Sequence, residues 1–257
     1  MWLRLRQIAL VAEELEPVLE QFRQVLGLEV CFRDKGVAQF GLENALLPVG
    51  NQFLEVVAPV AEGTTAGRYL ERRRGDGGYM VITQCDTHPP RRARVKELGI
   101  REVFSFERDD YVCMQLHPKD TGGSFFEIDE QRGTRAHDVD GPWEPAGNTG
   151  WESARRTDRV DAIVAAEIQA EHPAQVAKTW GDIAEIAVGS RDDGSLVMPL
   201  DNAEVRFVPA TDGRGDGLGG ISLRATDADA VLTAAAGAGV PIDGRTVTLC
   251  GMRMTLV

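Results

Sequence analysis

The sequence predicts an α+β protein made of four β-α-β-β-β repeats of about 50 residues each. Two observations carry this prediction. Strand-like segments recur along the whole chain, and each group of them includes one segment whose apolar residues recur every three or four positions, as on one face of a helix. A long polar stretch, residues 131–158, follows the second repeat. The repeats are therefore expected to pair, first with second and third with fourth, into two domains.

The first repeat opens with a strand over residues 3–11. A helix is predicted over 13–26, and Gly27 is a candidate C-cap. Strands are then expected over 28–33, 37–42 and 52–58, with Pro48, Gly50 and Asn51 as turn residues. The second repeat has a strand over 79–85, a basic helix over 89–98 closed by Gly99, and strands over 102–107, 111–116 and 123–129.

The second half repeats this order. Its third repeat has a strand over 160–165, a helix over 173–180 ending at Gly181, and strands over 183–188, 195–199 and 204–208. Its fourth has a strand over 220–225, a helix over 227–238, and final strands of which the last covers 253–257. The stretch between the halves has no periodic pattern, although it contains Trp143 and Trp151. It is interpreted as a linker that crosses the surface.

Composition excludes several classes of protein. The chain has 28 Lys plus Arg and 40 Asp plus Glu, a formal net charge of -12, so general binding to nucleic acid or to anionic membranes is not expected. No apolar run reaches the roughly 20 residues of a membrane span, and residues 1–6 alternate like a strand rather than a signal peptide. A cytoplasmic protein is the expectation. Its four cysteines form no C-x-x-C pair and are expected to be free thiols.

Three segments of the first half resemble one protein family. They are residues 45–59, 67–78 and 116–127, and the last contains the turn His-Pro-Lys-Asp-Thr-Gly-Gly at 117–123. In these segments the chain resembles the vicinal oxygen chelate superfamily, and within it methylmalonyl-CoA epimerase. The resemblance implies two glyoxalase-like domains, each with a curved mixed sheet. Residues 1–130 would carry the site, and residues 159–257, which resemble the family only in their repeat order, would be a degenerate copy.

The resemblance also implies a divalent metal, held by four inward-facing side chains. Matched by position, Gln7, Glu55 and Glu127 take three of the ligand places. All three are oxygen donors, and the ion would be Mg, Mn, Fe, Co, Ni or Zn. The metal would polarise a substrate oxygen, and Glu55 or Glu127 would move the proton as the catalytic residue.

Two positions depart from the family pattern. Met80 stands where the family has a liganding His, and a thioether is a poor ligand for a hard dication. Gln39 stands where the epimerase has an acid/base Glu, and an amide cannot abstract a proton at neutral pH. A metal centre and a metal-free site therefore both remain open, and epimerisation of methylmalonyl-CoA itself is not expected.

The remaining candidate site residues are identified by their expected burial and by their position in the predicted strands and turns. Glu55 shares a strand face with Phe53 and Val57, where a carboxylate is costly unless it is paired. Candidate substrate-binding residues are Gln39, Tyr79, Met80 and His117. His117 could instead hydrogen-bond its own turn, and His88 is expected to be a solvated residue at a helix entry.

These observations favour a lyase or isomerase that acts on a small, oxygenated, anionic organic compound. The alternative is a metal-free protein that binds a small molecule and sequesters it, as resistance proteins do. A ring-cleaving dioxygenase would need two histidine ligands and a carboxylate, and no such set is present. The chain is expected to be a monomer with an internal pseudo-dimer, or a homodimer.

Overall fold

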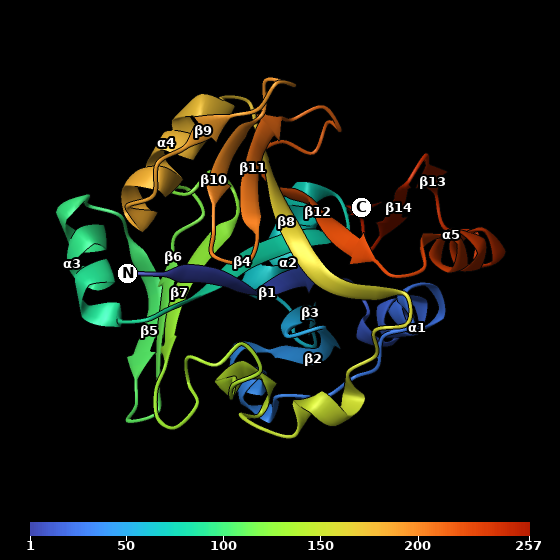
Figure 1. Cartoon of the computed structure of the whole chain (residues 1–257), viewed down its shortest axis with the longest axis horizontal. Coiled ribbons are helices and arrows are strands. Elements are labelled where there is room, and N and C mark those ends of the chain that lie inside the picture. Colours follow the sequence, from blue (N-terminus) through green and yellow to red (C-terminus); the bar gives the residue numbers. More distant parts are fainter. The chain divides into compact units, whose positions relative to one another are not determined.

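The computed structural model describes all residues 1–257 (Figure 1). Its strands form two open mixed sheets. The first sheet has the order β2-β3-β1-β4-β7-β6-β5. Its strands are β1 (Leu3–Val11), β2 (Leu42–Val49), β3 (Gln52–Pro59), β4 (Gly77–Cys85), β5 (Glu102–Glu107), β6 (Tyr111–Leu116) and β7 (Phe125–Gln131). The α+β prediction is confirmed, and the first two repeats supply this sheet.

The last two repeats supply the second sheet, of order β13-β14-β15-β12-β8-β11-β10-β9. Its strands are β8 (Val160–Ala170), β9 (Gly189–Ser190), β10 (Leu196–Pro199), β11 (Glu204–Pro209), β12 (Gly217–Ala225), β13 (Ile242–Asp243), β14 (Thr246–Leu249) and β15 (Met252–Leu256). In every repeat the first strand runs parallel to the last, and the last is antiparallel to the one before it. The predicted repeat is thus a structural one.

Five α-helices accompany the strands. They are α1 (Leu15–Leu26), α2 (Thr65–Arg73), α3 (His88–Glu97), α4 (Pro173–Ala184) and α5 (Ala228–Gly237). Gly27 caps α1 in the left-handed conformation, with φ 71°, as predicted. No helix is both long enough and apolar enough to cross a membrane.

The chain packs as two units, and each takes one repeat from each half. Unit 1 comprises Met1–Arg6, Tyr79–Pro142 and Ala165–Gly219. Unit 2 comprises Gln7–Gly78, Trp143–Val164 and Gly220–Val257. The second and third repeats therefore pack in unit 1, and the first and fourth in unit 2.

Trp180 on α4 is central to the packing of unit 1. Its ring stacks on Phe126 of β7 at a centroid distance of 4.1 Å and meets Phe207 of β11 edge-on at 5.8 Å. Its indole N–H donates to the carbonyl of Thr121 over 2.9 Å. The buried Arg91 of α3 donates to the Ala184 carbonyl at the end of α4. A ring stack and a capped helix end thus join the two repeats of this unit.

In unit 2, Gln52 of β3 bonds with both its amide atoms to the backbone of Ile163 in β8, over 2.7 and 2.8 Å. Gly50, in the turn between β2 and β3, has φ 63°, and a Cβ there would lie 2.0 Å from the carbonyl oxygen of Asp161. The predicted turn at Gly50 is confirmed, and the close approach of β8 adds a second reason why only glycine fits.

Local reasoning was wrong about the segment before β2. Residues 37–42 were expected to form a strand, but Lys35–Phe40 is a 3-10 helix that Asp34 caps by accepting from the Gly36 amide over 2.7 Å. The strand starts only at Leu42 and runs through Pro48. Because β2 is an end strand, a proline without an N–H costs it little. The segment 28–33 contributes only an isolated bridge at Phe32.

Two helices also differ from prediction. Residues 183–188 were expected to form a strand, but α4 continues past Gly181 to Ala184 and ends at Glu185, whose φ is 54°. Helix α2, at 65–73, was not foreseen as an element.

The four cysteines are free thiols, as predicted.

His88 is buried rather than solvated, with 2% of its surface exposed, because α3 packs this first residue against β7. Burial lowers the pKa of His88, and Arg92 lowers it further, against the opposing effects of Glu130, Glu102 and a hydrogen bond to the Ile128 backbone. The folded protein therefore favours the neutral imidazole.

We expect His88 to destabilise the protein as the pH falls below about 6.5. The unfolded chain then takes up a proton that the folded state resists, so the free energy of unfolding decreases. Urea unfolding at several pH values between about 5 and 8 should show this loss in the wild type. His88→Gln, which cannot titrate, should lose less stability over that range. Parallel curves for the two proteins would contradict the assignment.

Candidate functional site

In unit 2 the predicted residues Gln7 and Glu55 meet directly. The parallel register of β1 and β3 places Gln7 opposite Phe53 and Ala9 opposite Glu55, so both polar side chains share one sheet face. Gln7 Nε2 donates to Glu55 Oε2 over 2.8 Å, and Asn44 Nδ2 donates to Glu55 Oε1 over 2.6 Å. Each carboxylate oxygen of this buried side chain thus accepts from an amide.

Trp143 completes this network. Its indole N–H donates to Gln7 Oε1 over 2.8 Å, and its side chain is fully buried. Trp151 is also buried, edge-on to Phe53 at 5.0 Å. The expectation of a linker that crosses the surface is therefore wrong at both tryptophans, because each side chain is buried, Trp143 against Gln7 of β1 and Trp151 against Phe53 of β3. Two tryptophans in an otherwise polar stretch were the signal for this.

In unit 1 the predicted Glu127 belongs to a buried cluster of acidic groups. Cys113 of β6 and Glu127 and Asp129 of β7 bring their side-chain ligand atoms within 4.8 Å of one another. Cys113 Sγ donates to Glu127 Oε1 over 3.6 Å. Asp129 accepts from the hydroxyl of Tyr111 over 2.5 Å and from the amide of Met114 over 3.4 Å. This is the only such trio of His, Cys, Asp or Glu in the chain.

The surroundings of this cluster favour neutral side chains. Burial raises the pKa of Asp129 well above its usual range, and the neighbouring carboxyl of Glu127 raises it further. Burial likewise raises the pKa values of the Cys113 thiol and the Tyr111 hydroxyl, and the nearby carboxyls add to both effects. Two carboxyls this close repel each other when both are ionised, which favours a proton shared between them.

Of this cluster, only Glu127 was predicted from the sequence. Asp129 follows it by two positions and therefore lies on the same face of β7, which strand alternation could have revealed. Tyr111 and Cys113 alternate in the same way on β6, a strand that pairs with β7. Their proximity depends on the pairing of the two strands, which the sequence alone does not provide.

The other predicted residues have different surroundings. Met80 is half-buried on β4 and lies opposite Phe125, on the face that carries Glu127. Tyr79 is buried, with its ring edge-on to Phe125 at 5.0 Å. His117 Nδ1 accepts the Lys119 amide over 3.1 Å, which agrees with the turn role.

Gln39 is exposed on the 3-10 helix, where its amide donates to the Gly36 carbonyl over 2.9 Å. It does not stand on a strand, as expected, because that strand does not form.

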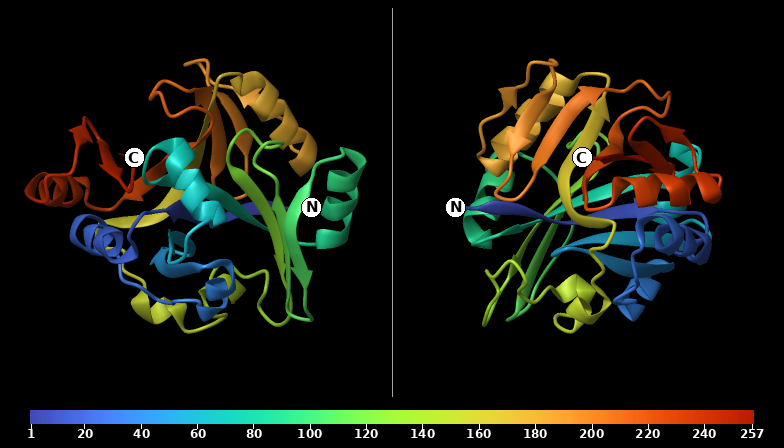
Figure 2. Two further views of the ribbon diagram at one scale, coloured as in Figure 1. Left: turned by 180° about the vertical axis from the view of Figure 1, so that it is seen from behind. Right: turned by 45° about the vertical axis from the view of Figure 1, so that its right-hand side comes forward.

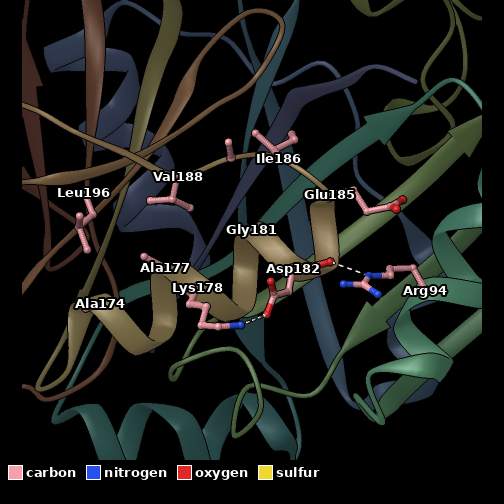
Figure 3. A pocket seen from close by; sticks show the side chains of 11 residues that line it. Arg94, Ala174, Ala177, Lys178, Gly181, Asp182, Glu185, Ile186, Val188 and Leu196 are labelled. Carbon is pink, nitrogen blue, oxygen red and sulfur yellow. Dashed lines mark hydrogen bonds and ion pairs between the residues drawn. The ribbon is translucent and has the colours of Figure 1, made fainter.

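Unit 1 also has an open cavity of about 520 Å³ that contains none of these residues. Small residues of α4 form one wall and the segment after the helix forms the other (Figure 3). Charged side chains of α3 and α4 stand at its rim, among them Lys178, whose ammonium bonds Asp182 over 2.5 Å.

A model of the glyoxalase-like domain matches residues 8–184, more than half of the chain. The chain belongs to this family. This glyoxalase-like chain is 27% identical over 131 residues to an ethylmalonyl-CoA/methylmalonyl-CoA epimerase of Cereibacter sphaeroides. The match covers 49% of this chain and 97% of the epimerase. The chain is 21% identical over 133 residues to the mitochondrial methylmalonyl-CoA epimerase of Homo sapiens, covering 49% and 73%.

The solved structure of a hypothetical protein from Staphylococcus aureus matches the whole glyoxalase-like chain. Its TM-score is 0.68 at 10% identity, and the match covers 100% of this chain and 99% of that one. The likeness shows that the same fold extends over both halves. The predicted family resemblance is confirmed.

The family's metal does not fit the matching residues of this glyoxalase-like chain. Gln7 turns its amide nitrogen to Glu55, and its oxygen accepts from Trp143. Met80 brings a thioether to the usual histidine place. Among the unpredicted residues, Cys113 is a poor source of thiolate, since burial raises the pKa of its thiol.

Proposed function

We propose that the protein is an isomerase that moves a proton without a metal ion, on a small, oxygenated, anionic organic compound. The observation that carries this proposal is the buried carboxyl pair of Glu127 and Asp129 in unit 1. Epimerisation removes a proton from a carbon atom and returns one, and a pair that holds one proton can do both. The relatives named epimerases support the choice of isomerase.

The surroundings distinguish the two carboxyls. Burial and the neighbouring Glu127 raise the pKa of Asp129 more than its hydrogen bonds from the Tyr111 hydroxyl and the Met114 amide lower it. Asp129 then carries the shared proton as the general acid, and Glu127 is the general base. After the transfer Glu127 holds a proton and Asp129 is ionised, so the two carboxyls exchange roles for the reverse reaction. Tyr111 is a positioning residue, since it holds Asp129 and through it the pair.

The substrate needs a C–H bond made acidic by an adjacent carbonyl, because a carboxylate is a weak base for any other carbon acid. The acid/base glutamate of the epimerases is Gln39 here, exposed on a 3-10 helix. The proposed reaction therefore differs from that of the epimerases either in its substrate or in the face from which the acidic carbon is attacked.

Proton exchange with heavy water tests this function. The protein would be incubated in D2O and EDTA with 2-substituted carboxylic acids and their thioesters, methylmalonyl-CoA among them, and the loss of the C–H signal followed by proton NMR. We expect exchange of at least one compound, and Glu127→Gln should slow it about 10²- to 10⁴-fold.

Glu130→Gln is the matched control, since Glu130 lies on the same strand with the opposite alternation and should leave the rate unchanged. Exchange that stops in EDTA and returns with added Mn²⁺ would overturn the metal-free mechanism. An unchanged rate in Glu127→Gln would remove Glu127 from it.

A second candidate is metal-free binding without chemistry. The amide at Gln39 favours it, since the position cannot act as a base. A compound that raises the thermal unfolding temperature but exchanges no proton, even after prolonged incubation, would point to this function instead.

A further inference from the structure

Strand β5 ends the first sheet without a partner on its outer side. It pairs only with β6, and β5, β6 and β7 lie side by side at that end of the sheet (Figures 1 and 2). Most of its residues are exposed, including Val103 at 43% and Phe104 at 36%. An exposed apolar end strand is a template for pairing with another strand.

The hairpin fixes which backbone groups face outward. The Arg108 amide donates to the Tyr111 carbonyl over 2.8 Å, and antiparallel pairs alternate along the ladder between hydrogen-bonded and non-bonded. The N–H and C=O groups of Phe104 and Phe106 therefore face β6. Those of Ser105 and Glu107 face the open edge.

The sequence of this edge is complementary to itself. If two copies run antiparallel about a twofold axis at Ser105, the two serines face each other and exchange both backbone hydrogen bonds. Phe104 of one copy then lies beside Phe106 of the other, and aromatic pairs across strands are favourable.

Charges flanking the strand also match in this register. Beyond the bulge, Glu102, which pairs only loosely with Arg92 over 3.7 Å in its own chain, comes near Arg108 of the second copy. The Arg108 side chain is 51% exposed, ion-pairs with Asp110 over 3.5 Å and lies over the Phe106 ring at 5.2 Å, so its guanidinium stands at this exposed end of the hairpin. The β-bulge between Glu102 and Phe104 leaves the run from Phe104 onward regular.

We propose that β5 pairs with the β5 strand of a second copy of this chain, giving a homodimer with one sheet continuous across the twofold axis. The backbone edge supplies the hydrogen bonds, and the pairs of phenylalanines and of opposite charges select this register. A six-residue edge is a small interface, so the dimer should be weak, with half-dissociation at about 10–100 µM.

A charge exchange tests the register directly. Sedimentation velocity of the full chain, from about 1 to about 500 µM, should show dimer formation in the wild type. Glu102→Arg or Arg108→Glu alone puts like charges face to face and should weaken the dimer about 5-fold or more. The double variant Glu102→Arg/Arg108→Glu restores opposite charges and should recover the wild-type constant.

Ser105→Pro provides a second variant. It removes an outward N–H and no bond to β6, so the fold should be kept while the dimer is lost. Val60→Lys, at an exposed apolar residue of unit 2, is the control and should dimerise as the wild type does. A wild type that stays monomeric at the highest concentration would overturn the proposal. So would a dimer that all four β5 variants leave unchanged, or a double variant that does not recover.

Discussion

Replacing Trp180 with alanine is expected to lower the free energy of unfolding by about 4 kcal/mol. The side chain is fully buried, stacked on Phe126 and edge-on to Phe207, so its removal opens a cavity between α4, β7 and β11. The variant also leaves the Thr121 carbonyl without its indole donor. Equilibrium urea unfolding, followed by circular dichroism, measures the loss.

Trp180→Phe separates the two contributions. It keeps a ring against Phe126 but removes the N–H donor, and it should cost about 1–2 kcal/mol. Trp2→Ala is the control at a partly exposed tryptophan, and its effect should be below about 1 kcal/mol. If Trp180→Ala cost no more than this control, the stack would not be what joins the two repeats of unit 1.

Asp129→Asn should slow the proposed proton exchange about 10²- to 10⁴-fold, because Glu127 then lacks the carboxyl with which it shares a proton. The same substitution should make the folded protein more stable than the wild type at high pH. Burial raises the pKa of Asp129, so the folded state prefers the protonated form. As the pH rises above about 3.9, the unfolded chain releases this proton first, and the wild type loses stability.

An asparagine cannot ionise and can still accept from Tyr111, so the variant should become more stable than the wild type as the pH increases. Unfolding curves at pH values from about 4 to 9, beside exchange rates in D2O, measure both effects. An Asp129→Asn protein that exchanges at the wild-type rate would show that the pair does not work as a unit. A stability difference that shrinks with rising pH would contradict the raised pKa.

Local patterns predicted most elements and the burial of the key carboxylates. Glu55 and Glu127 stand in apolar strands, where a carboxylate has to find partners, and both are buried with hydrogen-bonded partners. The helix at 13–26 and its cap at Gly27 follow from side-chain spacing and backbone conformation, which are also local.

One part of what the sequence missed depends on contacts between distant residues, and another part on a local cap. Trp143 bonds Gln7 across 136 positions, and no periodicity in the intervening chain signals it. The strand expected over 37–42 failed for a local reason, since the Asp34 cap stabilises a 3-10 turn there. The position of Gln39 followed from that error, and so the residue thought to line the site is exposed.

The four tryptophans are intrinsic fluorescent probes of the protein. Trp2 and Trp180 belong to unit 1, and Trp143 and Trp151 to unit 2. Each has a distinct neighbour that affects its emission, such as the imidazole of His137 beside Trp2 and the ring of Phe126 under Trp180. With one pair changed to phenylalanine, the fluorescence of the remaining pair reports the melting of a single unit. Two such variants, one for each pair, then follow the two units separately, with no dye attached.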